Sequence, residues 1–358
     1  MRVLQLIDSL DTGGAERVAV NIANALSSKV EGSFLCATRK EGILKESLFK
    51  NVDYLFLNKK KIIDLRAIKR LNTFLKRNYI NVVHAHSSSF FLATIIKIIN
   101  PKLTIIWHDH YGNSEFLNDR KYTALKICSK YFSHIFSVNK SLEIWSKEVL
   151  KVKNISFLPN FAIINKSIAL TNLKGVTGKR IVCLANLRPQ KDHITLLLAF
   201  KEVLKIFPDW TLHCVGKDFK DNYSKQIERK MKALELNKAV YLYDSKPDVF
   251  EILKQCDIGV LSSKSEGLPL ALLEYGLAEL PVIATKVGEC ETIISDNENG
   301  LLVDSLSVLQ LEKALRFYIE NKNRREAYAV KYNNHIKENY SKSSQIETIL
   351  KVYKTNIK

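Results

Sequence analysis

The segment 257–285, DIGVLSSKSEGLPLALLEYGLAELPVIAT, decides the fold of its half of the chain. Two short apolar runs, 257–261 and 282–285, flank a leucine-rich stretch whose apolar residues recur at helical spacing. Turn residues at 262–265 and the proline at 281 separate the three pieces. The segment therefore predicts a buried strand, a helix entered through residues 266–269 with a proline in its first turn, and a second buried strand.

Two glutamates mark this unit, Glu266 in the turn and Glu274 two turns into the predicted helix. For an arbitrary pair, the plainer interpretation is an entry residue and a solvated helix position. A helix that starts after a strand is also an anion site, because amides around Gly267, Leu268 and Leu270 and the helix dipole suit a diphosphate. A carboxylate beyond that site accepts hydrogen bonds from vicinal sugar hydroxyls, as in dinucleotide-binding folds.

The motif E-G-L-P-x4-E, followed by P-V-I-A-T and by Gly288, resembles the donor-site motif of glycosyltransferase family 4. In that family the first glutamate lies by the donor hexose, which implies this role for Glu266, and the second binds the nucleotide ribose, which implies it for Glu274. The resemblance covers nearly the whole chain. It implies the GT-B fold, in which two domains face a cleft, and retaining transfer from a nucleotide sugar. We also expect Ser263 and Gly216, each of which follows a predicted strand, to lie in the donor site.

Two further loops carry parts of the same resemblance. G-G-A-E-R at 13–17 resembles the family's N-terminal loop, so Gly13 and Gly14 are expected to approach the donor diphosphate. L-x-P-Q-K-D-H at 187–193 resembles its diphosphate loop, and Lys191 falls on the family's lysine. The chain departs from the pattern at Asn186, where the family usually has arginine, and Arg188 is the candidate to supply that charge.

Histidines gather at the ends of two predicted strands, 82–86 and 104–107. Polar residues at the carboxyl ends of strands line the cleft in open α/β sheets. The resemblance places the family's cleft histidine at His108, whereas His86, His110 and Tyr111 are acceptor-side candidates. We expect no metal here or elsewhere, since the chain has no D-x-D and these histidines have neither a cysteine nor a helical histidine partner.

The order of elements predicts an α/β protein with two doubly wound, Rossmann-like domains. Alternating strands and helices occur twice in the 358 residues, and a polar stretch at 159–179 separates the two series. We expect an acceptor-side domain at 1–165, a nucleotide-sugar domain at 166–342, and a last helix, 343–358, that returns to the first domain.

The chain is basic, with a formal net charge of +18, and most of the excess lies in its first half. Residues 1–165 contain 25 lysines and arginines against 13 acidic residues. A predicted helix at 59–79 has eight of these cations and one acid, with apolar positions that include Ile62 and Leu65. Such a helix is typical either of an ordinary solvated face or of a surface that meets an anionic membrane.

The cellular setting follows from the ends and the cysteines. The first ten residues predict a strand rather than a secretory signal, and no apolar stretch is long enough to span a bilayer. Six scattered cysteines without a C-x-x-C motif indicate buried free thiols. We expect a cytoplasmic protein that associates peripherally with the inner face of the plasma membrane.

Together these features predict a retaining, metal-independent glycosyltransferase without a cofactor. Its donor would be a hexose on UDP, GDP or ADP, and its acceptor a glycan or polyprenyl-linked sugar of a surface polysaccharide. A nucleotide-sugar 2-epimerase has two such domains as well, but the E-G-L-P and G-G-A-E-R motifs favour transfer. A nucleic-acid-binding protein is the non-enzymatic alternative, and no recognised motif supports it.

Overall fold

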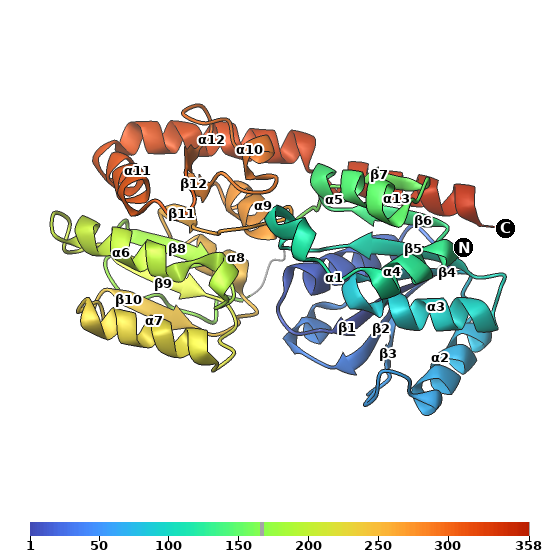
Figure 1. Ribbon diagram of the computed structural model, residues 1–358. Helices are drawn as coiled ribbons and strands as arrows, with labels where there is room; N and C mark the ends of the chain where they lie inside the picture. The colour runs from blue at the N-terminus through green and yellow to red at the C-terminus, as the bar shows by residue number, and fades with distance from the viewer. Residues whose placement is uncertain (165–167, 358) are drawn as a thin grey trace. The chain divides into compact units, whose positions relative to one another are not determined.

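The computed structural model describes residues 1–164 and 168–357, and these form two compact units. The first unit contains Met1–Phe161 and Lys342–Lys358, and the second contains Ala162–Ser341. Each is built around a parallel sheet with helices packed against it (Figure 1). The expected boundary between residues 165 and 166 lies outside the described residues. The prediction of two Rossmann-like α/β domains is confirmed.

The sheet of the first unit has the strand order β3-β2-β1-β4-β5-β6-β7. Its strands are β1 Arg2–Ser9, β2 Gly32–Lys40, β3 Val52–Phe56, β4 Val82–His86, β5 Thr104–Asp109, β6 His134–Ser137 and β7 Ile155–Phe157. Its α-helices are α1 Gly14–Leu26, α2 Leu65–Arg77, α3 Phe90–Ile99, α4 Thr123–Cys128, α5 Lys140–Trp145 and α13 Lys342–Asn356. The order reverses between β1 and β4, and ligands bind at such a switch point, beyond the carboxyl ends of the strands.

The second unit repeats this plan with the strand order β10-β9-β8-β11-β12-β13. Its strands are β8 Arg180–Leu184, β9 Thr211–Val215, β10 Val240–Tyr243, β11 Ile258–Leu261, β12 Val282–Thr285 and β13 Leu301–Val303. Its α-helices are α6 His193–Leu204, α7 Asn222–Ala233, α8 Val249–Leu253, α9 Leu270–Leu277, α10 Cys290–Ile293, α11 Val308–Glu320 and α12 Lys322–Asn339. Here the switch point lies between β8 and β11.

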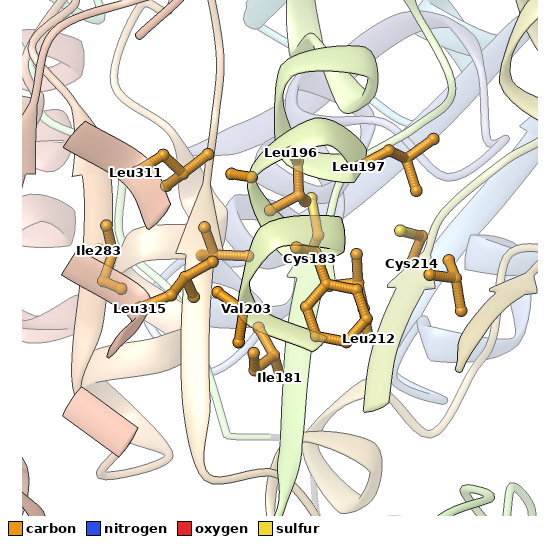
Figure 2. Packing of buried hydrophobic residues seen from close by; sticks show 14 of the residues in the cluster. Ile181, Cys183, Leu196, Leu197, Val203, Leu212, Cys214, Ile283, Leu311 and Leu315 are labelled. Atoms are coloured by element: carbon orange, nitrogen blue, oxygen red, sulfur yellow. The ribbon is translucent and has the colours of Figure 1, made fainter. Parts of the chain in front are cut away.

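Both faces of the second sheet are buried, which explains the continuous apolar runs of its strands. Figure 2 shows Leu196 of α6 and Leu315 of α11 among residues of β8, β9 and β12 in one hydrophobic cluster. Val260 of β11 belongs to the same cluster, whereas its neighbour Gly259 meets the ring of Tyr275 from α9 on the opposite face. A Cβ on Gly259 would lie 2.8 Å from that ring, so the close packing of α9 on β11 requires glycine.

The last helix, α13, packs in the first unit, as Figure 1 shows. Its residues Ile346, Ile349 and Tyr353 are fully buried there. Thr104 at the start of β5 donates a hydrogen bond to the carbonyl of Asn356 at 2.9 Å, which fixes the end of the helix on the sheet.

The predicted helix at 59–79 is wrong at its start. Helix α2 begins at Leu65 because Asp64, the single acid of this stretch, is its N-cap and accepts a hydrogen bond from the Ala67 amide at 3.1 Å. Ile62 therefore precedes the helix, and its side chain is 70% exposed instead of packed. Ile63 and Leu65 are exposed beside it.

The entry to α9 also differs from the prediction. Pro269 is the N-cap, with φ −73° and ψ 121°, and not a residue of the first turn. An extended ψ at this position keeps residues 266–269 out of the helix, so the E-G-L-P motif forms a buried turn. The helix therefore begins at Leu270, and Glu274 lies one turn inside it rather than two.

Candidate active site

The strands β8 and β11 separate toward their carboxyl ends, at the switch point of the second unit. They pair only where Ile258 and Gly259 lie beside the start of β8. Beyond that point the Tyr275 hydroxyl joins them, because it accepts from the Leu184 amide at 2.7 Å and donates to the Val260 carbonyl at 3.1 Å. The loops after these two strands carry Lys191 and Glu266, as the sequence predicts.

Lys191 and Glu266 form an ion pair beyond this switch point. The Lys191 ammonium lies 2.5 Å from Oε1 of Glu266, and the same oxygen accepts from the Ser263 hydroxyl at 2.6 Å. The Glu266 side chain is 5% exposed and that of Lys191 is 18% exposed. A pair this sheltered from water holds the ammonium at one edge of the site, with its charge weakly screened.

Hydrogen bonds between the two loops keep this pair in place. The Ser262 hydroxyl donates to the Lys191 carbonyl at 3.0 Å, and the Lys264 amide donates to the Gln190 carbonyl at 2.7 Å. From β12, the Thr285 hydroxyl donates to the Ser263 carbonyl at 2.7 Å. The loops after β8, β11 and β12, which are neighbours in the sheet, thus position Lys191 and Glu266.

Gly288 supports the E-G-L-P turn from the loop after β12. Its φ is +54°, which favours glycine, and a Cβ there would collide with the carbonyl oxygens of Glu266 and Gly267. The next amide, that of Glu289, donates to the Gly267 carbonyl at 2.9 Å. The glycine that follows P-V-I-A-T is therefore needed for the backbone to approach the turn closely.

The other residues of this motif that are predicted to bind the donor lie just before α9 or in it. Gly267, Leu268 and Leu270 are buried at its N-terminus, where no side chain of the N-cap residue caps the helix. Glu274 is half-buried on the same helix. The helix dipole therefore adds positive potential beside the Lys191–Glu266 pair.

Arg188 lies in the loop after β8, three residues before Lys191. Its guanidinium stacks on the ring of Phe219, 4.3 Å from the ring centre, in the loop after β9. Asn186, which stands where the family has arginine, accepts a hydrogen bond from the Lys217 amide at 2.8 Å. Gly216 closes this corner, because a Cβ on it would collide with the carbonyl of Ala185. Phe219 therefore supports the guanidinium of Arg188 in this loop, and the contact of Arg188 with the diphosphate stays a prediction.

The glycines of the first unit lie at the start of α1, with Gly13 as its N-cap. The carboxylate of Glu16 folds back over this terminus, and a Cβ on Gly13 would collide with it. Around Gly14 there is open space for a Cβ. The helix terminus therefore already holds an acidic group, which an incoming phosphate would have to move.

Side chains from three strands form a polar stripe on one face of the first sheet. Gln5 on β1 is in register with His84 on β4, and His86 is in register with His108 on β5. All four are at most 1% exposed. Their apolar neighbours in sequence point to the opposite face, into a hydrophobic cluster. Because the strands alternate in this way, the histidines stack side by side.

His108 is buried in this structure, and its expected role as the cleft histidine stays a prediction. It is 1% exposed, and its ring lies 4.0 Å from that of His110 and 5.2 Å from that of His84, measured between ring centres. His110 is partly exposed, and its Nε2 lies 3.0 Å from Nδ1 of His86. His110 is therefore the histidine that this edge of the sheet presents to solvent.

All four rings are held neutral. Burial lowers the pKa of His84, His86 and His108 well below the usual value, and neighbouring histidines lower it further. Burial lowers the pKa of His110 to about 3. A neutral imidazole has one N–H donor and one lone-pair acceptor, so its hydrogen bonds decide which nitrogen carries the proton and which one accepts.

Within the described residues, one group of three side chains is close enough to share a metal ion. One nitrogen each from His84, His86 and His108 lies within 4.8 Å of the others. Both nitrogens of His86 are already engaged, however, with His110 at 3.0 Å and with Gln5 at 2.8 Å. A bound ion would have to break one of these bonds, so the residues do not fit a ready site.

A buried ion pair that the sequence did not reveal holds the loop after β5. Both guanidinium amino groups of Arg120 donate to Asp109, at 2.7 and 2.8 Å. The guanidinium also stacks on the rings of Tyr111 and Trp145, each with its centre at 4.4 Å. Tyr111, an expected acceptor-side residue, is thereby fixed beside His110. The pair joins residues eleven apart in an irregular loop, so no periodic signal announces it.

Comparison with known proteins gives the same arrangement of two domains. A family model described as "Glycosyltransferase Family 4" matches residues 12–164, and one described as "Glycosyl transferases group 1" matches residues 170–335. An uncharacterised glycosyltransferase of Haemophilus influenzae is 24% identical over 331 residues, which cover 86% of this chain and 87% of that protein. These matches are to both halves of the chain.

Two better-described proteins are similar as well. The Escherichia coli UDP-Gal:α-D-GlcNAc-diphosphoundecaprenol α-1,3-galactosyltransferase is 26% identical over 271 residues, or 68% of this chain and 67% of that protein. A crystal structure of Anabaena HepE in complex with UDP-glucose superposes with a TM-score of 0.81 at 16% identity, over 99% of this chain and all of that chain. At that identity the likeness shows the fold alone.

Proposed function

Because this chain belongs to the glycosyltransferases of family 4 and group 1, with the GT-B fold, we propose that it transfers a hexose, with retention, from a UDP-sugar to a lipid-linked glycan. The observation that carries the proposal is the Lys191–Glu266 pair at the switch point of the second unit. UDP is proposed because HepE binds UDP-glucose and the Escherichia coli relative uses UDP-Gal, as their names state. The acceptor class rests on the diphosphoundecaprenol-linked acceptor of the same relative.

The chemical task of such a site is to stabilise the charge that develops on the leaving diphosphate. Lys191 supplies a full positive charge from the loop after β8, and the N-terminus of α9 supplies a partial one. Glu266 orients the ammonium and, in our proposal, accepts a hydroxyl of the donor sugar, while Glu274 accepts the ribose hydroxyls. Fixed charges of this kind need no reorganisation when the glycosidic bond to the phosphate breaks.

We assign contact with a hydroxyl of the donor or the acceptor to His110 rather than to His108. The reason is access, since His110 is partly exposed and His108 is not. The neutral ring of His110 can accept a proton or a hydrogen bond but carries no charge to stabilise a phosphate. Its contribution is therefore to position a sugar by accepting a hydrogen bond from one of the sugar hydroxyls.

Thermal unfolding with a panel of nucleotides tests the donor assignment. We expect saturating UDP and UDP-sugars to raise the unfolding midpoint by about 5 °C, because ligand at 100 times its Kd adds about 2.7 kcal/mol to the folded state. We also expect the same rise in excess EDTA, because the proposal places lysine and helix amides, not a divalent ion, on the diphosphate. GDP and ADP serve as matched controls. A rise with GDP alone, or one that EDTA removes, would contradict the proposal.

We further propose that the first unit meets an anionic membrane through the segment 60–70. Within the described residues, no helix has the length and apolar character needed to cross a bilayer. Three aliphatic side chains lie exposed among the cations of this segment, Ile62 at 70%, Ile63 at 57% and Leu65 at 76%. A basic surface with exposed aliphatic side chains can bind headgroups and insert into their boundary with the acyl chains.

The structure selects the cations for a test of this surface. Lys59 is 7% exposed, and Arg70 donates to the carbonyls of Phe56 and Leu57, so both hold the local fold. We therefore choose Lys60, Lys61, Arg66 and Lys69, which are exposed. The protein should pellet with phosphatidylglycerol vesicles at low salt, and the fourfold change of these residues to Gln should abolish pelleting. Each surface cation contributes about 1 kcal/mol near an acidic bilayer, and salt weakens that attraction.

A second variant separates charge from insertion. Ile62→Ser with Ile63→Ser leaves every cation in place, so it should still pellet at low salt but dissociate at a lower salt concentration than the natural protein. Equal pelleting with neutral phosphatidylcholine vesicles, or none with phosphatidylglycerol, would exclude the docking surface and favour an acceptor that is not held in a membrane.

A further inference from the structure

Tyr353, at the far end of the chain, touches the polar stripe of the first sheet. Helix α13 covers this face, and the Tyr353 hydroxyl lies 2.5 Å from Nδ1 of His84. The amide nitrogen of Gln5 lies 3.4 Å from the same hydroxyl. All three side chains are fully buried. A polar contact between the last helix and the first strand is therefore sealed from water.

From Gln5 the contacts continue to the partly exposed histidine. The amide oxygen of Gln5 lies 2.8 Å from Nε2 of His86, and Nδ1 of His86 lies 3.0 Å from Nε2 of His110. The five side chains thus form one unbroken series of four hydrogen bonds. It ends inside the sheet at His84 and at the protein surface at His110.

The two atoms of the Gln5 amide fix the direction of every proton in this series. Its oxygen can only accept, so His86 carries its proton on Nε2. Nδ1 of His86 is then an acceptor, and His110 must donate to it from Nε2. The Gln5 nitrogen can only donate, so the Tyr353 hydroxyl accepts from it and gives its own proton to His84.

We propose that Tyr353 and Gln5 are positioning residues that fix the tautomer and ring orientation of His110, so that His110 presents Nδ1 to a substrate solely as a hydrogen-bond acceptor. The one N–H of His110, on Nε2, donates to His86, and the lone pair on Nδ1 is then the group available to a ligand. The ligand group that fits is a sugar hydroxyl acting as donor. This inference rests on the role assigned to His110 under the proposed function, whereas the hydrogen-bond series itself does not.

Nitrogen-15 NMR of histidine-labelled protein tests the series without any assay of activity. In the natural protein His86 and His110 should both appear as the Nε2–H tautomer, with Nδ1 unprotonated. In Tyr353→Phe, Gln5 loses the acceptor for its amide and can turn over, so His84, His86 and His110 should show mixed tautomers. Tyr318→Phe is the matched control, because Tyr318 is also fully buried and donates to the Val282 carbonyl at 3.1 Å, away from the histidines. Its histidine spectrum should not change.

Kinetics then connect the series to the reaction. We expect Tyr353→Phe to lower kcat by up to about 100-fold, the loss that a misplacement of about 1 Å can produce, with little change in KM for the donor. Gln5→Met, which keeps the volume but removes both amide groups, is the second variant if Tyr353→Phe does not fold. It should release His86 and His110 while His84 keeps its bond to Tyr353.

Several results would overturn the inference. A proton on Nδ1 of His110 in the natural protein would mean that the series runs the opposite way. An unchanged histidine spectrum in both variants would remove Tyr353 and Gln5 as positioning residues. A stoichiometric metal bound by His84, His86 and His108 would do the same, because coordination takes the lone pairs. Altered tautomers with unchanged kcat would leave the series in place and remove His110 from the proposed function.

Discussion

Lys191→Ala is expected to slow sugar transfer about 100-fold or more, the loss that follows removal of one group stabilising a developing oxyanion. Lys191 is ion-paired with Glu266 of the E-G-L-P turn at 2.5 Å. The substitution removes the full charge that faces the leaving diphosphate in our proposal and leaves the carboxylate, which would repel it. Most of the loss should therefore appear in kcat. Initial rates with a UDP-sugar and calorimetric affinity for UDP measure it.

Lys205→Ala is the matched control for this variant. Lys205 also forms an ion pair of 2.5 Å, with Glu202, but 61% of its side chain is exposed at the end of α6. Loss of such an exposed pair changes little, so rate and UDP affinity should remain those of the natural protein. Glu274→Ala separates ribose from phosphate and should weaken UDP binding roughly 10- to 100-fold, the value of hydrogen bonds to a charged group. Unchanged UDP affinity in Lys191→Ala would place the diphosphate elsewhere.

A steep loss of stability below pH 6.5 is expected from the buried histidines. In the unfolded chain each histidine binds a proton near pH 6.5, whereas burial holds the folded-state pKa of His84, His86 and His108 well below that value. Above pH 6.5 both states are neutral and stability is complete. As the pH falls below 6.5, the unfolded state takes up protons that the folded state refuses, so unfolding becomes easier.

The size of this effect is large for a single domain. Each such histidine lowers the free energy of unfolding by about 1.4 kcal/mol for every pH unit below 6.5, so three together lower it by about 4 kcal/mol per pH unit. The total free energy of unfolding of a domain is usually about 5–15 kcal/mol. Urea unfolding at pH 8 and pH 5.5 measures it. The fluorescence of Trp107 and Trp145 reports on the first unit, because both are buried there, and Trp210 lies in the second.

His108→Leu is the informative variant here. Neither ring nitrogen of His108 has a hydrogen-bond partner, so leucine should fit without an unmet polar group and should reduce the pH dependence by one proton. It should also retain transfer, because the side chain does not reach the surface. Equal urea midpoints at the two pH values, or loss of transfer in this variant without loss of stability, would contradict the burial of His108.

Sequence patterns predict the sheets well because both sheets are parallel and buried. Short apolar runs such as 258–261 and 282–285 are typical of buried strands, and both are strands in the structure. The sequence also predicted the part of the candidate site that lies in the second unit, because Lys191 and Glu266 are in loops that follow two neighbouring strands. The start of α2 was predicted wrongly, at residue 59, although Asp64, an aspartate before a helical run, is an N-cap signal.

Other features depend on contacts that no local pattern contains. His108 lies in β5 and His110 follows that strand, and tertiary packing leaves the first buried and the second partly exposed. The guanidinium of Arg188 stacks on Phe219, which comes from a loop 31 residues further along the chain, and no sequence pattern indicated this contact. Tyr353 lies 269 residues from His84, its partner. Such pairs are set by tertiary structure.

The membership of α13 in the first unit has a consequence for the synthesis of the protein. Residues 1–161 leave the ribosome long before residues 342–357, and until then the polar stripe of the first sheet lacks its covering helix and the Tyr353 hydroxyl. The second unit, in contrast, is one continuous stretch of chain. Translation of the first unit thus begins before that of the second but is completed after it, and the buried histidines of the first sheet stay uncovered until α13 has been synthesised.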